Sequence, residues 1–206
     1  MDRDLLILTD QDLVEKTKEG DRRAFSELVR RHQKALLRLS LRFMKDLDMA
    51  QDIVQEAFIK AYEKLGSFEG RSSFKSWLYQ ITINAARNRL REGRHGMTDI
   101  NNVRVAVGPS AEKRLVHSAV ADLIQGQIEK LPARQKEALM LRVYEDLSFA
   151  EIAEIMDCPY DTAKANYRHA LLKLKEAFQA DKELQRWTYD VDLWVTELRQ
   201  PAEVEV

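Results

Sequence analysis

Apolar residues recur at steps of three and four along most of this 206-residue chain, the period of one face of an α-helix. The clearest stripe lies within residues 50–65 and consists of Ala50, Ile53, Val54, Ala57, Phe58, Ala61, Tyr62 and Leu65. The chain has seven glycines and four prolines, too few for the frequent tight turns of a β-sandwich or barrel. The period therefore predicts an all-α fold.

Two helical sets are separated by a segment without helical period. We interpret residues 1–92 as one domain of short and long helices, with Thr9 or Asp10 as the first N-cap. Residues 93–111 contain three glycines and a proline and are expected to form a flexible linker. Residues 112–178 are expected to form a second small helical domain, which ends in a helix-turn-helix.

The net charge of −1 conceals an uneven distribution of charge along the chain. Residues 21–94 carry 16 basic and 9 acidic residues, a net charge of +7. A basic segment of this kind favours a polyanion as partner, although a solvated helical surface would carry the same charge. Residues 179–206 form an acidic extension with Trp187 and Trp194, which either covers a basic surface, binds a partner, or adds a helix to the second domain.

Residues 149–178 have the layout of a DNA-reading helix-turn-helix, with a short helix, a turn and a longer helix. Asp157 occupies the turn position that most often holds glycine, and aspartate enters the left-handed region more readily than most residues. The residues expected to face a major groove are Tyr160, Asp161, Lys164, Ala165, Arg168 and His169. The alternative is a helical hairpin whose polar face contacts only water.

The expected helix at residues 50–65 begins with a polar, mostly acidic face opposite its apolar stripe. This face offers carboxylates and amides to a basic partner surface, and consists of Asp48, Gln51, Asp52, Gln55 and Glu56.

Aromatic and basic residues are interleaved in residues 68–91. Aromatic rings stack on unpaired bases, which is worth about 1–3 kcal/mol per base, and cations hold the phosphate backbone. The combination favours single-stranded DNA as ligand, with Phe68, Arg71, Phe74, Lys75, Trp77, Tyr79, Arg87, Arg89 and Arg91 as candidates. The alternative is that Phe74 and Trp77 are core residues.

The sequence has no phosphate loop, no glycine-rich dinucleotide turn and no HExxH helix, and its four histidines are scattered. Cys158 is the single cysteine, so neither an internal disulfide nor a cysteine zinc site is expected. No uncharged run approaches the roughly 18 apolar residues of a membrane span, and the N-terminus lacks the features of a secretory signal. We therefore expect a cytoplasmic protein that is not an enzyme, needs no cofactor or metal, and does not insert into a membrane.

The sequence resembles the sigma-70 family of bacterial transcription initiation factors, specifically its small extracytoplasmic-function (ECF) group. Residues 48–58 resemble the polymerase-binding helix of that group, residues 68–90 its segment for the −10 promoter element, and residues 131–156 the approach to its DNA-binding helices. The resemblance implies core RNA polymerase and promoter DNA as partners. It adds Ser72, Asn84 and Asn88 to the −10 candidates, and assigns the helix-turn-helix to the −35 element. Family members are often held inactive by an anti-sigma protein, so such a partner is also expected.

The chain departs from the usual family recognition helix, which carries more cations. Asn166, His169 and Leu171 stand where the family has arginine. Fewer cations weaken non-specific DNA affinity and its dependence on salt. We therefore expect an atypical −35 preference or a greater reliance on the −10 contacts. A regulator that uses its helix-turn-helix alone, and a degenerate sigma-like module that only binds partners, remain the alternatives.

Overall fold

The computed structural model describes residues 3–93 and 123–181. The chain divides into two compact units, residues 1–105 and 106–206, and each is considered by itself. Within the described residues every regular element is a helix, so the predicted all-α fold is confirmed.

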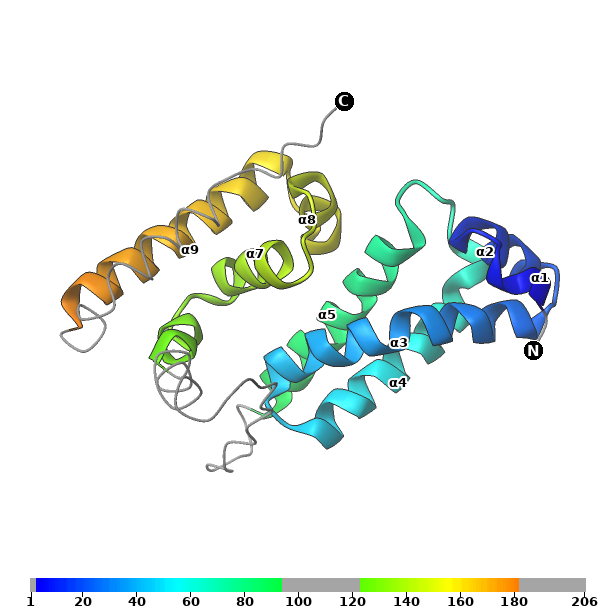
Figure 1. Ribbon diagram of the computed structural model, residues 1–206, viewed down its shortest axis with the longest axis horizontal. Coiled ribbons are helices and arrows are strands. Elements are labelled where there is room, and N and C mark those ends of the chain that lie inside the picture. The colour runs from blue at the N-terminus through cyan, green and yellow to red at the C-terminus, as the bar shows by residue number, and fades with distance from the viewer. Residues whose placement is uncertain (1–2, 94–122, 182–206) are drawn as a thin grey trace. The chain divides into compact units, whose positions relative to one another are not determined.

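The first unit is a bundle built around one long helix, α3. Figure 1 shows α3, α4 and α5 side by side, with α1 and α2 at one end of the bundle. In chain order its elements are α1 (Arg3–Leu6), α2 (Asp10–Lys18), α3 (Arg22–Met44), α4 (Leu47–Lys64), the 3-10 turn η1 (Leu65–Ser67) and α5 (Phe74–Gly93).

Side-chain caps define where these helices begin. The Thr9 hydroxyl accepts a hydrogen bond from the Asp12 amide at 3.2 Å, and the Asp12 carboxylate accepts one from the Thr9 amide at 2.9 Å. Asp21 caps α3 by accepting from the Arg23 amide, and Asp46 caps α4 by accepting from the Met49 amide. Each cap satisfies an N–H group that has no partner within its helix. The sequence left Thr9 and Asp10 open as the first cap, and the structure selects Thr9.

The apolar stripes meet in the centre of the first unit. Its core includes Leu13, Leu28, Leu36, Leu39, Ile53, Leu78, Tyr79 and Ile83, all nearly or fully buried. Tyr62 was expected on the buried stripe of α4 but is 45% exposed. Its ring packs edge-on against Phe25 of α3 at a centroid distance of 4.9 Å, so it covers the rim of the core.

The second unit is described from residue 123 onward. Residues 123–129 are helical, and α7 (Ala133–Tyr144), α8 (Phe149–Met156) and α9 (Tyr160–Ala180) follow. Pro132 directly precedes α7, where its missing N–H group costs no hydrogen bond. Helix α7 packs against both α8 and α9, and Ile128, Leu139, Met140 and Phe178 are buried among these helices.

Several sequence predictions fall outside the described residues. The predicted linker, residues 93–111, is described only at Gly93, which ends α5, and the extension, residues 179–206, only as far as Asp181. The start of the second domain near residue 112 also lies outside them. None of the described helices is long and apolar enough to cross a membrane.

The turn of the helix-turn-helix offers a test of backbone strain. Asp157 adopts a left-handed conformation, with φ 49° and ψ 61°, as its place in the turn predicted. Because glycine adopts this conformation without steric cost, Asp157→Gly is expected to raise the free energy of unfolding of this unit by about 0.5–1 kcal/mol. Hydrogen exchange at the α8 and α9 amides would measure the change. In the control, Glu154→Gly inside α8, we expect a loss of about 1 kcal/mol. A stabilising control or a destabilising Asp157→Gly would contradict this account.

Candidate nucleic-acid and partner surfaces

The polar face predicted on α4 lies on the outside of the first unit. Asp48, Gln51, Asp52 and Gln55 are exposed and Glu56 is partly exposed, while Ala50, Ile53, Ala57, Phe58 and Ala61 are buried on the opposite side. The face carries three carboxylates and two amides, with Lys60 paired to Glu56 at its edge. It can therefore accept hydrogen bonds and ion pairs from a basic partner surface.

An exposed apolar residue belongs to this face and was missed from the sequence. Ile59 is 52% exposed and lies four residues after Gln55, so it shares the same side of α4. An exposed apolar side chain amid polar groups is typical of the centre of a protein interface. The signal was present in the sequence, as an isoleucine that breaks the polar face rather than joining the apolar stripe.

The aromatic residues predicted to stack on DNA are mostly core residues. Phe68, Phe74 and Tyr79 are 5%, 3% and 0% exposed, which corrects their prediction as stacking surfaces. Trp77 is partly exposed and therefore stays a predicted stacking residue.

The burial has a physical cause in the packing of these rings. Phe68 lies 4.8 Å from Trp77 and 6.1 Å from Phe74 between centroids, and His32 of α3 lies 5.6 Å from Phe74. Burying Phe68 and Phe74 against each other and against Trp77 is worth more than exposing them to water. Phe68 and Phe74 therefore anchor the two ends of the loop at residues 68–73.

The polar candidates of this segment are accessible. In the loop Arg71 is exposed and Ser72 partly so, and Lys75 is partly exposed at the start of α5. Along α5 the remaining candidates are at least partly exposed, and all but Arg89 follow at steps of three and four: Asn84, Arg87, Asn88, Arg89 and Arg91. The Arg87 and Arg91 guanidinium groups donate to the side-chain oxygens of Asn84 and Asn88 at 3.0 and 3.4 Å. The loop and this stripe therefore carry accessible cations and amides.

The turn between α8 and α9 has the geometry of a helix-turn-helix. Asp157, in the left-handed conformation, ends α8, and the Cys158 amide donates to the Ala153 carbonyl at 3.0 Å. Ala153, a small residue near this turn, is 8% exposed. Ser148 and Glu151 form a capping box that fixes the start of α8.

Helix α9 separates its residues as predicted. Its buried residues are Ala163, Tyr167, Ala170, Leu171, Leu174 and Phe178. All six −35 candidates are exposed: Tyr160, Asp161, Lys164, Ala165, Arg168 and His169. Burial also raises the pKa of Tyr167, so its phenol stays neutral in the core.

Two arginines of α7 position the helix-turn-helix and were not predicted. Arg134 donates to the carbonyl of Met156 at 2.7 Å, at the C-terminal end of α8. Arg142 donates to the carbonyl of Leu147 at 2.8 Å and lies 5.5 Å from the ring of Phe149, at the other end. Their roles depend on contacts made in the folded chain, so no local sequence pattern predicts them.

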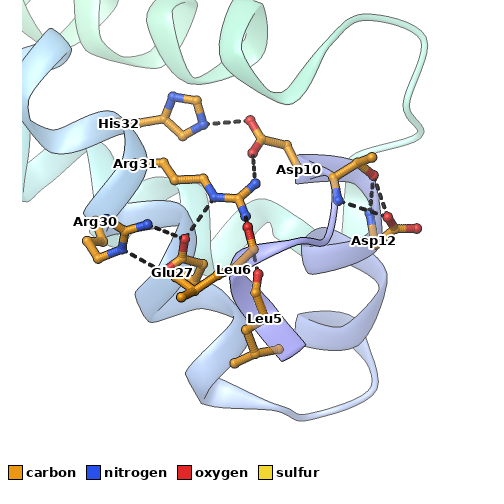
Figure 2. Close-up of polar contacts among 9 residues, drawn as sticks. Leu5, Leu6, Asp10, Asp12, Glu27, Arg30, Arg31 and His32 are labelled. Atoms are coloured by element: carbon orange, nitrogen blue, oxygen red, sulfur yellow. Dashed lines mark hydrogen bonds and ion pairs between the residues drawn. The ribbon is translucent and has the colours of Figure 1, made fainter. Parts of the chain in front are cut away.

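A polar network joins the N-terminal helices to α3, as Figure 2 shows. Arg31 donates to the Glu27 carboxylate at 2.9 Å, to Asp10 at 3.0 Å, and to the carbonyls of Leu5 and Leu6. His32 lies 2.6 Å from the other Asp10 oxygen, and the hydrogen bond between them is the main cause that lowers the pKa of Asp10. His32 is therefore a structural residue of this network.

Two family models match the chain in the places where these surfaces lie. The model for sigma-70 region 2 matches residues 28–95, and that for sigma-70 region 4 matches residues 121–174. Among the described residues, no group of three or more histidine, cysteine, aspartate or glutamate side chains is placed to hold a metal ion.

Proteins similar in sequence along most of the chain belong to the same family. The chain is 37% identical over 189 residues to the RNA polymerase sigma-H factor of Pseudomonas aeruginosa, with 82% of this chain and 94% of that protein covered. It is 38% identical over 169 residues to the ECF RNA polymerase sigma-E factor of Escherichia coli K12, with 77% and 88% covered.

Solved structures show the same fold. The structure of CnrH with the cytosolic domain of CnrY matches with a TM-score of 0.64 at 24% identity, covering 84% of this chain and 99% of that one. The sigma factor RpoE of Bartonella quintana, solved with the anti-sigma factor NepR, matches with a TM-score of 0.56 at 28% identity, covering 77% and 98%. The two sigma-70 regions, in this order and with relatives along most of its length, show that the chain belongs to the ECF group of the sigma-70 family of RNA polymerase sigma factors.

Proposed function

We propose that this sigma factor acts in the cytoplasm, without catalytic chemistry of its own, through three separate surfaces. The polar face of α4 binds core RNA polymerase, the loop at residues 68–73 and α5 hold the melted −10 strand, and α9 reads the −35 element. The observation that carries the proposal is the division of charge within the first unit. An acidic face on α4 and a cationic stripe on α5 suit a basic protein partner and a nucleic acid respectively.

Binding of the −10 strand would depend on the polar residues of the loop and α5. Extruding a base from a duplex costs a few kcal/mol of stacking, which protein contacts must offset. Arg71, Lys75, Arg87 and Arg91 would hold the phosphate backbone, and the amides of Asn84 and Asn88 can bond base edges. Trp77, the partly exposed ring beside the loop, is the candidate for stacking.

Reading of the −35 element would use the exposed face near the start of α9. Lys164 and Arg168 can bond guanine acceptors or phosphates, and Asp161 can accept from cytosine N4. The buried opposite face, with Tyr167 and Ala170, holds α9 against α7 so that these side chains keep their direction.

The sparse charge of α9 gives a quantitative prediction. His169→Arg restores a cation at an exposed position and is expected to tighten binding to duplex DNA at low salt. Each added phosphate contact steepens the slope of log K against log salt by about 0.9. Fluorescence anisotropy of the full chain with a duplex at several salt concentrations would measure the slope. An unchanged slope, with the protein folded, would place residue 169 away from the phosphates and contradict this docking of α9.

An anti-sigma protein is the further partner that we propose. Its support is the structural relative RpoE, which was solved with the anti-sigma factor NepR. The exposed residues Ile59 and Tyr62 of α4 offer apolar area for a protein partner.

The proposal is tested by transcription in a purified system. The full chain is added to core RNA polymerase of its own organism with fragmented genomic DNA, and the RNA 5′ ends are mapped. Discrete starts that share upstream −10 and −35 sequences are expected. Duplex binding without polymerase binding would instead favour a regulator that uses its helix-turn-helix alone. Polymerase binding without discrete starts would favour a degenerate partner-binding module.

A further inference from the structure

Helix α2 contacts the first residue of the loop at residues 68–73. Lys18, at the end of α2, donates from its Nζ to the carbonyl oxygen of Phe68 at 2.9 Å. The same ammonium lies 6.0 Å from the centroid of the Phe68 ring, within reach of a cation–π contact. The Lys18 side chain is 25% exposed, so this contact is partly shielded from water. A charged donor therefore fixes the first residue of the loop.

The turn of the loop also approaches α2 closely, at Gly70 and Gln11. Gly70 has a φ of +72°, and a Cβ built on it would lie 3.5 Å from the Gln11 side chain. Gln11 donates to Glu15 at 3.1 Å, and Glu15 in turn accepts from Lys18 at 3.0 Å. Gln11, Glu15 and Lys18 thus form one row along α2. This row lies next to the loop from Phe68 to Gly70.

Helix α2 is itself firmly attached to the bundle. Its Leu13 and Val14 are fully buried, and Asp10 is bonded to Arg31 and His32 of α3 (Figure 2). A contact from α2 therefore fixes the loop relative to the bundle, because α2 is itself packed on the bundle.

We propose that Lys18 is a positioning residue for recognition of the −10 strand: its hydrogen bond to Phe68 fixes the start of the loop before DNA binds. This inference rests on the proposed function of the loop. A loop that is ordered in advance loses less conformational freedom on binding, and so binds its ligand more tightly. Lys18 bonds to the backbone of the loop, at the Phe68 carbonyl. It can therefore change the affinity of the loop for DNA without contacting DNA itself.

The test replaces Lys18 in the full chain and assays the holoenzyme. Lys18→Met keeps the apolar stem of the side chain but removes the donor. The probe is a fluorescent single strand that carries the −10 non-template sequence of a promoter mapped with the wild-type protein. We expect affinity for this strand to fall about 5- to 10-fold, with affinity for core polymerase unchanged. Lys18→Arg, which can donate to the same carbonyl, should restore most of the loss.

Lys16→Met is the matched control, because it removes the same charge from an exposed position of the same helix. We expect it to leave the strand affinity nearly unchanged. Equal losses in Lys16→Met and Lys18→Met would mean that only the net charge matters, and would overturn the inference. Unchanged strand affinity in Lys18→Met, or a parallel loss of polymerase affinity, would overturn it as well. Failure of the wild-type holoenzyme to bind the strand would instead contradict the proposed function.

Discussion

Placing two cations on the acidic α4 face is expected to weaken binding to core RNA polymerase about 100-fold. The double change Asp52→Lys with Gln55→Lys places two cations at the centre of this face, where the proposed partner surface is basic. Like charges brought together across an interface cost several kcal/mol, and a 100-fold loss corresponds to about 2.7 kcal/mol. Both side chains are exposed and lie in the interior of α4, so the bundle should remain folded.

The measurement is a titration of labelled protein with core polymerase, repeated at two salt concentrations. Because the expected repulsion is electrostatic, the loss should shrink as salt rises. The matched control is Glu19→Lys with Gln33→Lys, which changes the net charge equally at two other exposed positions of the unit. Equal losses in both variants would show that α4 has no special role. Unchanged affinity in the α4 variant would move the polymerase contact to another surface.

The elements of this fold follow from signals that lie close together in sequence. The caps at Thr9, Asp21 and Asp46 stand directly before amphipathic stripes, so the helix starts could be predicted. The turn at Asp157 was expected from the helix-turn-helix layout, and the six residues expected on the outer face of α9 are all exposed. Local sequence carries this information because capping and periodicity involve neighbouring residues.

The candidate sites were harder to predict, because they depend on which side chains become buried when the helices pack. Phe68 and Phe74 lie among cations in sequence and looked available to DNA, yet both rings pack into the core beside Trp77. The contact from Lys18 to the Phe68 carbonyl joins residues 50 positions apart. No local pattern distinguishes that lysine from Lys16 on the same helix, and only the packing of α2 against the bundle does so.

Removing the carboxylate of Glu27 is expected to destabilise the first unit by about 2–3 kcal/mol. Glu27 is 7% exposed and accepts from Arg30 at 2.7 Å and from Arg31 at 2.9 Å (Figure 2). Removing one member of a buried ion pair costs about 3–5 kcal/mol. The cost of Glu27→Gln should fall below that range, because the Arg30 side chain is half exposed and Arg31 keeps Asp10 and two carbonyls as partners. Chemical denaturation at neutral pH measures it.

The same carboxylate gives the stability a defined dependence on pH. Its hydrogen bonds from Arg30, and then from Arg31, lower the pKa of Glu27 from 4.5 to about 2 in the folded protein. The folded state therefore holds fewer protons than the unfolded state between these values, and stability falls as the pH falls through that window. Above about pH 5 the contribution is complete. Since glutamine does not titrate, the gap between wild type and Glu27→Gln should be constant there and narrow between pH 4.5 and 2.

Glu63→Gln on α4 serves as the control, since it makes the same chemical change at an exposed position. We expect it to alter the free energy of unfolding by less than about 0.5 kcal/mol at any pH. If the gap between wild type and Glu27→Gln did not narrow in acid, the loss would come from altered packing and not from charge. A narrowing gap would identify Glu27 as the group through which Arg30 and Arg31 stabilise α3. Because Arg31 also donates to Asp10 and to the carbonyls of Leu5 and Leu6, it links Glu27 to the N-terminal helices.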